Sequence, residues 1–272
     1  MSEFLSYIRI YITYLFGRDH VNDKLLVMNI SPPLLNYIYW SLIFSILCIV
    51  SPFVYKRTFP ITCSLMDKRK LTELPCYCAS IIHHLYVTPL GFYCIFNDFN
   101  LFANGGTVQL NQEAIDSISF IFGYLIGDTI FLAIPEFLTD GKYEYLIHHI
   151  CSFALFFGLL ISPSEISRYI PHLLICEITN IFLIIAWHLK VHGLRETVYL
   201  KITELLFVIT FFLTRIVNLP LSMGALIYNF GNQLSFIKYF LIPIIGLQFY
   251  WFSKIISALY LRTNSSKLKS KE

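Results

Sequence analysis

Charged residues are scarce in this chain. Only 14% of its 272 residues are Asp, Glu, Lys or Arg, whereas 56% are hydrophobic and 17% are aromatic. Soluble domains carry about 25% charged residues, and a single globule of this length has too little interior to hide so much apolar surface. The composition therefore argues against a soluble enzyme, and equally against collagen, a coiled coil or an intrinsically disordered chain.

Basic tracts and metal-binding clusters are also sparse. The net charge is only +3, and no Lys- and Arg-rich run with interleaved aromatics points to nucleic acid as a partner. The odd number of cysteines, seven, lying mostly in apolar runs, indicates buried thiols rather than a disulfide framework. His188 and His192 have the i, i+4 spacing that can hold one metal. The H-x-x-H-H clusters of membrane di-iron enzymes are missing from the sequence, however, so no metal ligand and no cofactor are predicted.

Long apolar runs dominate the chain instead. A bilayer core of about 30 Å needs about 20 apolar residues in a helix, whereas a transmembrane β-barrel needs short alternating segments. The runs of helical length are 34–54, 73–96, 115–134, 143–162, 167–190, 198–220 and 236–261. The predicted fold class is therefore all-α, a polytopic membrane helical bundle of about seven transmembrane spans.

The first apolar stretch is shorter than these runs. It extends from Phe4 to Phe16, contains Arg9 and lacks the small-residue cleavage site of a signal peptide, so it predicts an interfacial helix. The expected organisation is an interfacial segment over 1–33, a first span with a cytosolic loop over 34–65, a membrane domain over 66–263 and a polar basic tail over 264–272. The expected connections outside the membrane include 55–72, 97–114, 135–142 and 221–235.

The distribution of Lys and Arg predicts the orientation. Twelve of them fall on the side that holds the 55–72 loop, Lys142 and the C-terminal tail, and four fall on the other side. The side with twelve is expected to be cytosolic. The N-terminus is then lumenal and the C-terminus cytosolic.

Three costly polar groups are predicted to lie at one depth. Asp128 lies about seven residues before the 135–142 connection, and His148 and His149 lie about as many residues after it. At the rise of a helix, all three side chains are then roughly 10 Å deep in the membrane, measured from that connection. An Asp and a His on neighbouring helices can form a pair in which the carboxylate fixes the tautomer and raises the basicity of the imidazole, as a general base requires. Adjacent histidines on a helix point about 100° apart, so at most one can face Asp128 squarely.

Other ionisable groups lie in the later spans. Glu177 and Asn180 are three residues apart and share a helix face near mid-span. Glu204 and Arg215 share a face but are roughly 16 Å apart along the helix, too far for a salt bridge. Arg215 is therefore expected to extend toward the lumenal interface, and Lys254 toward the cytosol.

Three further histidines lie within the spans, at positions 83, 84 and 172. An isolated histidine in a membrane helix most often forms a hydrogen bond with another helix, because an unpartnered polar group is costly there. A structural role is therefore the expectation for His83, His84 and His172.

The pattern of these residues resembles the TLC-domain family of endoplasmic-reticulum membrane proteins over about 66–263. That family includes the ceramide synthases, the translocating-chain-associated membrane protein and small lipid-related members without a homeobox-like insert, which this chain resembles most. The residues that carry the resemblance are Gly123-Tyr124 with Asp128, His148-His149 opening a span, Glu177-Ile-Thr-Asn180, Arg215, and Gln248 with Trp251.

The resemblance implies an acyl-transfer site. In ceramide synthases the matching His pair, with two acids three residues apart, joins a fatty acyl-CoA to a sphingoid amine. This chain keeps both histidines, but it has Glu177 and Asn180 at the acid pair and no His-Asp ahead of the histidines. The implied site is ceramide-synthase-like but degenerate. Its implied catalytic residues are His148, His149, Asp128 and Glu177, and its implied substrate-binding residues are Asn180, Arg215 and Gln248.

Two functions remain open at this point. The first is a lipid acyltransferase of the endoplasmic reticulum that takes acyl-CoA as co-substrate and in which a histidine acts as base or carries the acyl group. The second is a non-enzymatic protein that binds lipid, regulates membrane composition or serves as a secretory-pathway chaperone or cargo receptor. Membrane lipids are the expected partners of either, and a second copy of the chain stays open as a partner. The enzyme requires that the His pair face a cavity open to the cytosol.

A third class, a seven-span receptor or retinal protein, is disfavoured. Lys254 in the last span would be its Schiff-base residue, but it lies near the cytosolic end. The receptor signatures Asp-Arg-Tyr and Asn-Pro-x-x-Tyr are absent from the expected spans.

Overall fold

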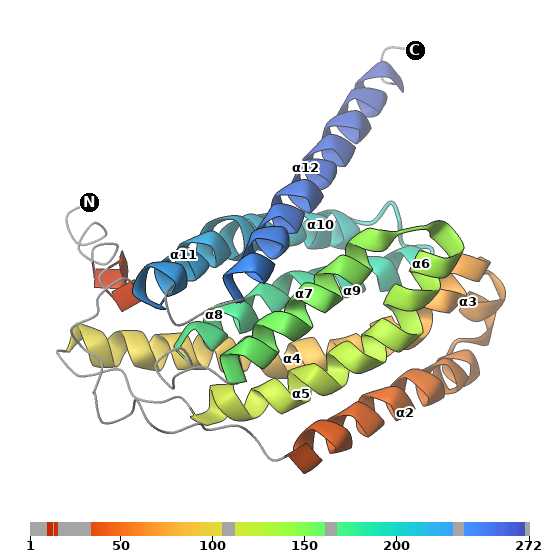
Figure 1. Cartoon of the computed structure of the whole chain (residues 1–272). Coiled ribbons are helices and arrows are strands. Elements are labelled where there is room, and N and C mark those ends of the chain that lie inside the picture. The colour runs from red at the N-terminus through yellow and green to blue at the C-terminus, as the bar shows by residue number, and fades with distance from the viewer. Residues whose placement is uncertain are drawn as a thin grey trace.

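The computed structural model describes residues 10–12, 14–15, 34–104, 112–160, 168–230 and 237–269, and over these ranges it contains helices and no strand. The elements in chain order are α2 (Leu34–Thr58), α3 (Pro60–Ser64), α4 (Lys68–Ala103), α5 (Gln112–Asp128), η2 (Thr129–Ala133), α6 (Ile134–Asp140), α7 (Tyr143–Leu160), α8 (Ile170–Leu174), η4 (Ile175–Glu177), α9 (Ile178–Val191), α10 (Val198–Phe211), η5 (Phe212–Asn218), α11 (Leu219–Phe230) and α12 (Ile237–Lys269) (Figure 1).

Six helical segments of the described chain are long and apolar enough to cross a membrane. They are Leu35–Thr58, Lys68–Leu101, Asp116–Asp140, Ile170–Val191, Val198–Asn229 and Lys238–Leu261. Their outer faces expose large apolar side chains, such as Leu42 and Ile242, as expected for contact with lipid. The protein is thus an all-α, multi-pass membrane protein, as the sequence predicts. The remaining expected span, 143–162, is the 18-residue helix α7, which is not among the six.

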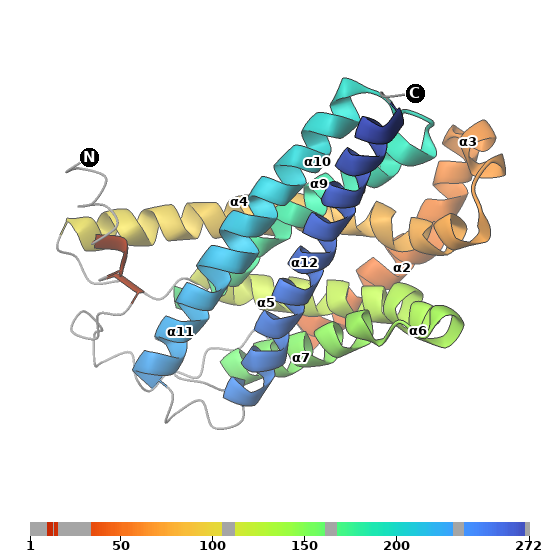
Figure 2. The same ribbon diagram turned by 90° about the horizontal axis from the view of Figure 1, so that it is seen from above.

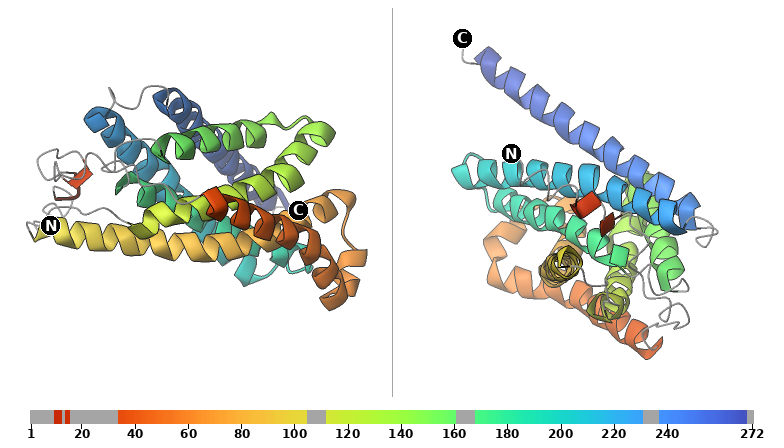
Figure 3. Two further views of the ribbon diagram at one scale, coloured as in Figure 1. Left: turned by 60° about the horizontal axis from the view of Figure 1, so that its bottom comes forward. Right: turned by 90° about the vertical axis from the view of Figure 1, so that its left-hand side faces the viewer.

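The helices form a bundle with α4 and α5 between two groups of neighbours. Figure 3 shows α2 on one side of α4 and α5, with α10, α11 and α12 on the other. The connections from α2 to α4, from α6 to α7 and from α9 to α10 gather at one end, on the right in Figures 1 and 2. These connections carry basic residues of the more basic side, so the structure brings that charge to one end of the bundle. The cytosolic placement of this end stays a prediction.

Several helices extend into segments that were expected to be loops. Helix α4 continues to Ala103, within the expected 97–114 loop, and α11 continues to Phe230, within 221–235. Most of 135–142 is helix α6, which ends at Gly141 in the left-handed conformation with φ 65°, typical of a glycine C-cap. The boundaries of these predicted loops were wrong, because hydropathy marks where the apolar core of the bilayer ends, whereas a helix continues until a cap or breaker stops it.

The expected 55–72 loop is also partly helical. Helix α3 occupies Pro60–Ser64 within it, and α4 begins at Lys68. Asp67 caps the start of α4, because its Oδ1 accepts a hydrogen bond of 2.8 Å from the backbone N–H of Lys70.

Only five residues of the expected 1–33 interfacial segment are described. Tyr14 and Leu15 are buried in the core, and the hydroxyl of Tyr11 donates a hydrogen bond of 3.1 Å to Asn218 Oδ1. Tyr11, Tyr14 and Leu15 thus pack against the bundle, and the interfacial location of the segment stays a prediction. The rest of 1–33, and 270–272 of the predicted tail, lie outside the described residues.

Two wide π-helical turns interrupt the spans, and each ends two residues before a proline. The N–H of Ile134, before Pro135, bonds to the carbonyl of Thr129, and the N–H of Leu219, before Pro220, bonds to that of Thr214. Both bonds reach back five residues instead of four. Proline lacks an N–H and its ring clashes with the carbonyl four residues earlier, so the wider turn accommodates proline without breaking the helix.

Gly123 and Gly127 let α5 lie against α2. A Cβ atom added at Gly123 would lie 2.5 Å from the carbonyl carbon of Trp40 and 2.8 Å from the nitrogen of Ser41. At Gly127 the nearest atom, Cβ of Phe44, would be 3.3 Å away. Small residues four apart allow this backbone approach in membranes, where close packing replaces the hydrophobic effect. The contact fixes α5, which carries Tyr124 and Asp128.

We predict that Gly123→Ala destabilises the protein whereas Gly224→Ala does not. The new methyl at position 123 meets backbone atoms of α2, which should lower the free energy of unfolding by about 1–3 kcal/mol. A methyl at Gly224 has no atom within 4 Å, so helix propensity alone applies and the change is neutral or stabilising by up to about 1 kcal/mol. Thermal unfolding of both variants in one detergent measures the difference. Equal midpoints would contradict the close approach of α2 and α5.

Candidate functional site

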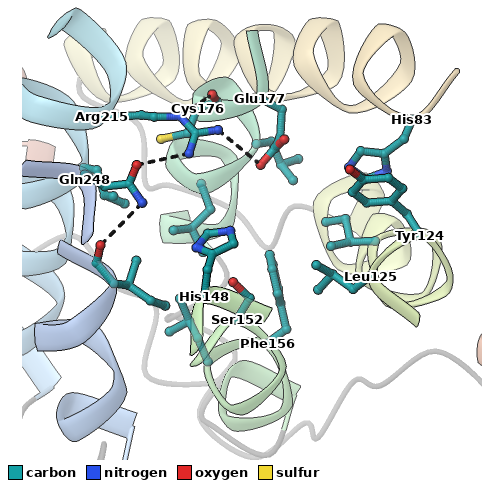
Figure 4. Close-up of a pocket in the computed structure, with 16 residues that line it drawn as sticks. His83, Tyr124, Leu125, His148, Ser152, Phe156, Cys176, Glu177, Arg215 and Gln248 are labelled. Atoms are coloured by element: carbon teal, nitrogen blue, oxygen red, sulfur yellow. Dashed lines mark hydrogen bonds and ion pairs between the residues drawn. The ribbon is translucent and has the colours of Figure 1, made fainter. Parts of the chain in front are cut away.

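Two adjoining cavities occupy the centre of the bundle. Their volumes are about 320 Å³ and about 70 Å³. Five residues from four different helical segments line both of them, namely Tyr124, Leu125, His148, Glu177 and Arg215. Figure 4 shows the smaller cavity, with His148 between the Arg215–Gln248 pair and the Tyr124 ring. The wall of the larger cavity also includes four charged residues at the end where the basic connections gather, Arg69, Glu73, Glu136 and Lys254.

Asp128 and His149 form an acid–imidazole pair in the larger cavity. His149 Nε2 lies 3.1 Å from Asp128 Oδ2, and both residues are buried. The other ring nitrogen, Nδ1, lies 2.7 Å from the hydroxyl oxygen of Thr129, which donates to the carbonyl of Leu125. The predicted pairing of Asp128 with one histidine is confirmed, and the partner is His149. Both ring nitrogens of His149 thus face a polar group, and the two contacts fix the orientation of the ring.

His148 faces both cavities without a carboxylate partner. Its Nδ1 is buried and has no hydrogen-bond partner among the described residues. Its ring packs edge-on against His149 and against Trp251 of α12, with centroids 5.8 Å and 5.4 Å away. The ring is therefore positioned by packing, and a nitrogen is left for a ligand. As the spacing of adjacent helical residues predicts, only one of the two histidines contacts Asp128. That residue is His149, and His148 points into the cavities instead.

Glu177 is the centre of a second polar group. Its Oε2 lies 3.0 Å from His84 Nδ1 and accepts a hydrogen bond of 2.7 Å from the amide of Asn180. Its Oε1 lies 4.0 Å from Arg215 Nη2. The shared face of Glu177 and Asn180 is confirmed. The side-chain amide of Asn180 donates a hydrogen bond to the carboxylate of Glu177. An acidic residue at position 180 would instead bring a second negative charge close to Glu177.

Arg215 is buried in the bundle, with 6% of its surface exposed. Its Nε donates to Thr179 Oγ1 at 2.8 Å and to the carbonyl of Cys176 at 3.1 Å. Its Nη1 donates to Gln248 Oε1 at 3.1 Å, a contact drawn in Figure 4. The prediction that Arg215 extends to the lumenal interface is wrong. The acceptors on η4, α9 and α12 hold the guanidinium inside. Arg215 also lies within the π turn η5, which changes the direction in which its side chain leaves the helix.

The other charged residues of the spans lie at the ends of the bundle. Glu204 lies 3.0 Å from Lys190, and Lys254 is exposed and lies 3.3 Å from Glu144 on α7. Glu204 and Arg215 thus contact different residues, Lys190 and Gln248. Lys254 packs over the ring of Tyr250 at 4.2 Å beside the cavity wall.

Three histidines have purely structural contacts. His172 Nδ1 lies 2.9 Å from Asn218 Oδ1, which confirms its structural role. His188 and His192 both contact the hydroxyl of Tyr55, at 3.4 Å and 2.9 Å. The two residues with metal-ligand spacing thus share a phenol group as partner.

His83 and His84 are the site residues that sequence reasoning missed. His84 pairs with Glu177 and lines the larger cavity, and His83 stacks on Tyr124 with centroids 3.9 Å apart and lines the smaller one. The available signal was a second His-His pair in a span, the same pattern as 148–149. Their partners lie on helices far apart in the sequence, so spacing alone did not connect them. With Glu177 they place three potential metal-ligand atoms within 4.8 Å of one another.

The site can move protons and bind both polar and apolar groups. It offers two imidazoles with an unpartnered nitrogen (those of His83 and His148), two imidazoles beside carboxylates and a guanidinium. All of them lie in a water-poor interior where hydrogen bonds and charges act strongly. Its charged rim suits a polar head group, and its apolar walls suit a lipid.

The comparisons with known proteins agree on one family. The model of the TLC domain matches residues 77–257, well over half of the chain. Human TLC domain-containing protein 1 is 27% identical over 99 residues, and the protein of that name from Mus musculus is 26% identical over 99 residues. In each case the alignment covers 36% of this chain and only 39% of the relative. No solved structure matches the chain. With a family model matched across most of the membrane bundle, the chain belongs to the TLC domain family.

Proposed function

We propose that this protein is a lipid acyltransferase that moves an acyl group from acyl-CoA to an amine or hydroxyl of a membrane lipid of the sphingoid or ceramide type. One observation carries the proposal. His148 lines a cavity of about 320 Å³, and its Nδ1 has no partner within the described chain. A buried imidazole nitrogen without a partner is costly, and a bound substrate that donates a proton to it would remove that cost.

The proposed reaction assigns the proton to His148. The substrate nitrogen or oxygen attacks the thioester carbonyl while His148 takes its proton, and a new C–N or C–O bond forms. The C–S bond then breaks, and the imidazolium returns the proton to the sulfur of CoA. Asp128 and His149 act as positioning residues, because the ring of His149 packs against that of His148. Glu177 and Asn180 with Arg215 and Gln248 bind the acceptor and polarise its nucleophile.

The shape of the site supports a lipid substrate. An apolar groove of about 210 Å³ between α9, α10 and α12 shares Leu183, Phe207 and Ile255 with the larger cavity. This groove gives an alkyl chain a place beside the polar cavity. The charged rim lies at the end that the positive-inside rule places in the cytosol, where the water-soluble head of acyl-CoA is available. We place the protein in the endoplasmic-reticulum membrane, with a lumenal N-terminus and a cytosolic C-terminus.

A second candidate is non-enzymatic lipid binding or sensing. Specific contacts favour it, since both nitrogens of His149 and both oxygens of Glu177 already face protein groups. Groups held in this way stabilise a bundle without taking part in chemistry. In this alternative the cavity and groove hold a lipid that is not changed.

We predict that His148→Ala abolishes acyl transfer, with a loss of at least about 100-fold, the usual contribution of a general base. The assay uses purified protein in nanodiscs with labelled acyl-CoA and a panel of sphingoid and lysolipid acceptors. It follows label in lipid products and label that remains covalently on the protein. His188→Ala is the matched control, because His188 lines neither cavity and contacts Tyr55.

Two results would decide between the candidates. Label transferred by wild type and His188→Ala but not by His148→Ala supports the enzyme. If wild type is folded, retains lipid and transfers no label to any acceptor, the acyltransferase proposal fails and lipid binding takes its place.

We further predict that Asp128→Asn lowers kcat by about tenfold or more and leaves the KM for acyl-CoA nearly unchanged. The amide keeps the shape but removes the charge that orients His149, so the loss should appear in the transition state. Asp140→Asn is the control, since Asp140 is exposed and pairs with Lys142 at the bundle end. A rise in KM alone would show that Asp128 binds substrate and does not position the histidine.

A further inference from the structure

The geometry points to a metal site. We propose that His83, His84 and Glu177 bind one divalent transition-metal ion, of which zinc fits best. Each residue offers one ligand atom, and the three atoms lie within 4.8 Å of one another. The proposal goes beyond acyl transfer and does not depend on it.

Unpartnered imidazole nitrogens are the first support. The Nδ1 atom of His83 is buried and lacks a hydrogen-bond partner within the described residues, and Nδ1 of His84 is buried beside the Glu177 carboxylate without an aligned hydrogen bond. His83 is only 2% exposed and His84 only 1%. Buried polar atoms almost always have a partner, and an exception calls for an explanation such as an ion. The unpartnered nitrogen of His83 and the unaligned contact of His84, on adjacent residues, point to one common ligand.

The contact between His84 and Glu177 is the second support. Nδ1 and Oε2 are 3.0 Å apart, yet Nδ1 does not make an aligned hydrogen bond. Two ligands of one tetrahedral zinc, with bonds of about 2.0–2.1 Å, lie roughly 3.4 Å apart and direct their lone pairs at the ion instead of at each other. The observed contact is close to that arrangement, and rotation of side chains would close all three ligands onto an ion.

The surroundings hold the ligands in place. His83 lies flat on the ring of Tyr124, and Asn180 donates to Oε2 of Glu177. Arg215 faces the other oxygen, Oε1, at 4.0 Å. Glu177 would therefore bind the ion through Oε2, while Oε1 faces the guanidinium of Arg215. The negative charge of the carboxylate would then lie between the metal ion and Arg215. Such second contacts fix the orientation of metal ligands.

The donor set determines the class of ion. Two imidazoles and one carboxylate are the ligands of catalytic zinc sites, which leave a fourth position open. Calcium and magnesium prefer oxygen ligands and fit this set poorly. Because His84 and Glu177 both line the larger cavity, the open position is accessible to a water molecule or to the oxygen of a bound lipid.

The test measures metal directly. Full-length protein, purified without an oligohistidine tag, is treated with a chelator, loaded with Zn²⁺ and dialysed. Mass spectrometry of the metal should then find about one zinc per chain. Co²⁺ in place of Zn²⁺ should give the visible absorption of a four- or five-coordinate site. Zn²⁺ should also raise the unfolding temperature of the wild type, a readout that requires no variant.

Matched variants locate the ion. His83→Gln, His84→Gln and Glu177→Gln should each weaken Co²⁺ binding by at least about tenfold, since even outer-shell changes cost that much. The double variant His188→Gln/His192→Gln removes the other helical His pair, which contacts Tyr55, and should bind as the wild type does.

Several outcomes would overturn the proposal. They are zinc well below one per chain in the folded wild type, no rise in its unfolding temperature, or loss of metal in the His188/His192 variant with retention in His84→Gln. Metal content is read without substrate, so it separates the two proposals. Zinc binding without acyl transfer supports the metal site and contradicts only the acyltransferase proposal. Acyl transfer by protein that binds no zinc contradicts only the metal site.

Discussion

The buried guanidinium of Arg215 sets a condition that the rest of the site must meet. A charged group inside a membrane bundle has no bulk water, so its donors must find acceptors on neighbouring helices. Three elements supply them, through the carbonyl of Cys176, the hydroxyl of Thr179 and the amide of Gln248. The positions of η4, α9 and α12 around η5 are thereby coupled, because a shift of any of them would leave a donor unsatisfied.

The same principle joins the opposite walls of the cavity. Asp128 and His149 connect α5 to α7, and His84 and Glu177 connect α4 to η4. Each contact both stabilises a pair of helices and places an ionisable group at the cavity. His148 differs, since it is held by ring packing against Trp251 and His149. Most side chains of the site therefore both stabilise the bundle and take part in the proposed chemistry. His148 is the exception, because it contributes no polar contact between helices.

Sequence reasoning succeeded where a contact is local along the chain. Asp128 and His149 lie on either side of one short connection, so counting residues from it gave their common depth. Asn180 lies one helical turn from Glu177, and their contact follows from that spacing. The family resemblance also came from short motifs within single spans. These contacts require only helix geometry and the order of the spans.

Contacts between distant segments were beyond the reach of spacing. His84 lies on α4 and Glu177 on η4, and the sequence alone does not indicate that these two elements are neighbours in the bundle. Arg215 was misplaced for a different reason. Regular helix geometry put it on the face of Glu204, but the π turn over Phe212–Asn218 begins between them and redirects everything that follows. Pro220, one residue beyond Leu219, was the visible sign of that turn.

The two π turns also affect how this chain should be compared with its relatives. A wide turn holds one residue more than a regular turn, so Thr129–Ala133 and Phe212–Asn218 each absorb an additional residue within a span. A relative with a regular helix at either place would be one residue shorter there, and its later side chains would still point the same way. Single-residue gaps in an alignment of this family therefore belong inside these two spans, beside the prolines, where gap penalties for membrane helices would normally forbid them.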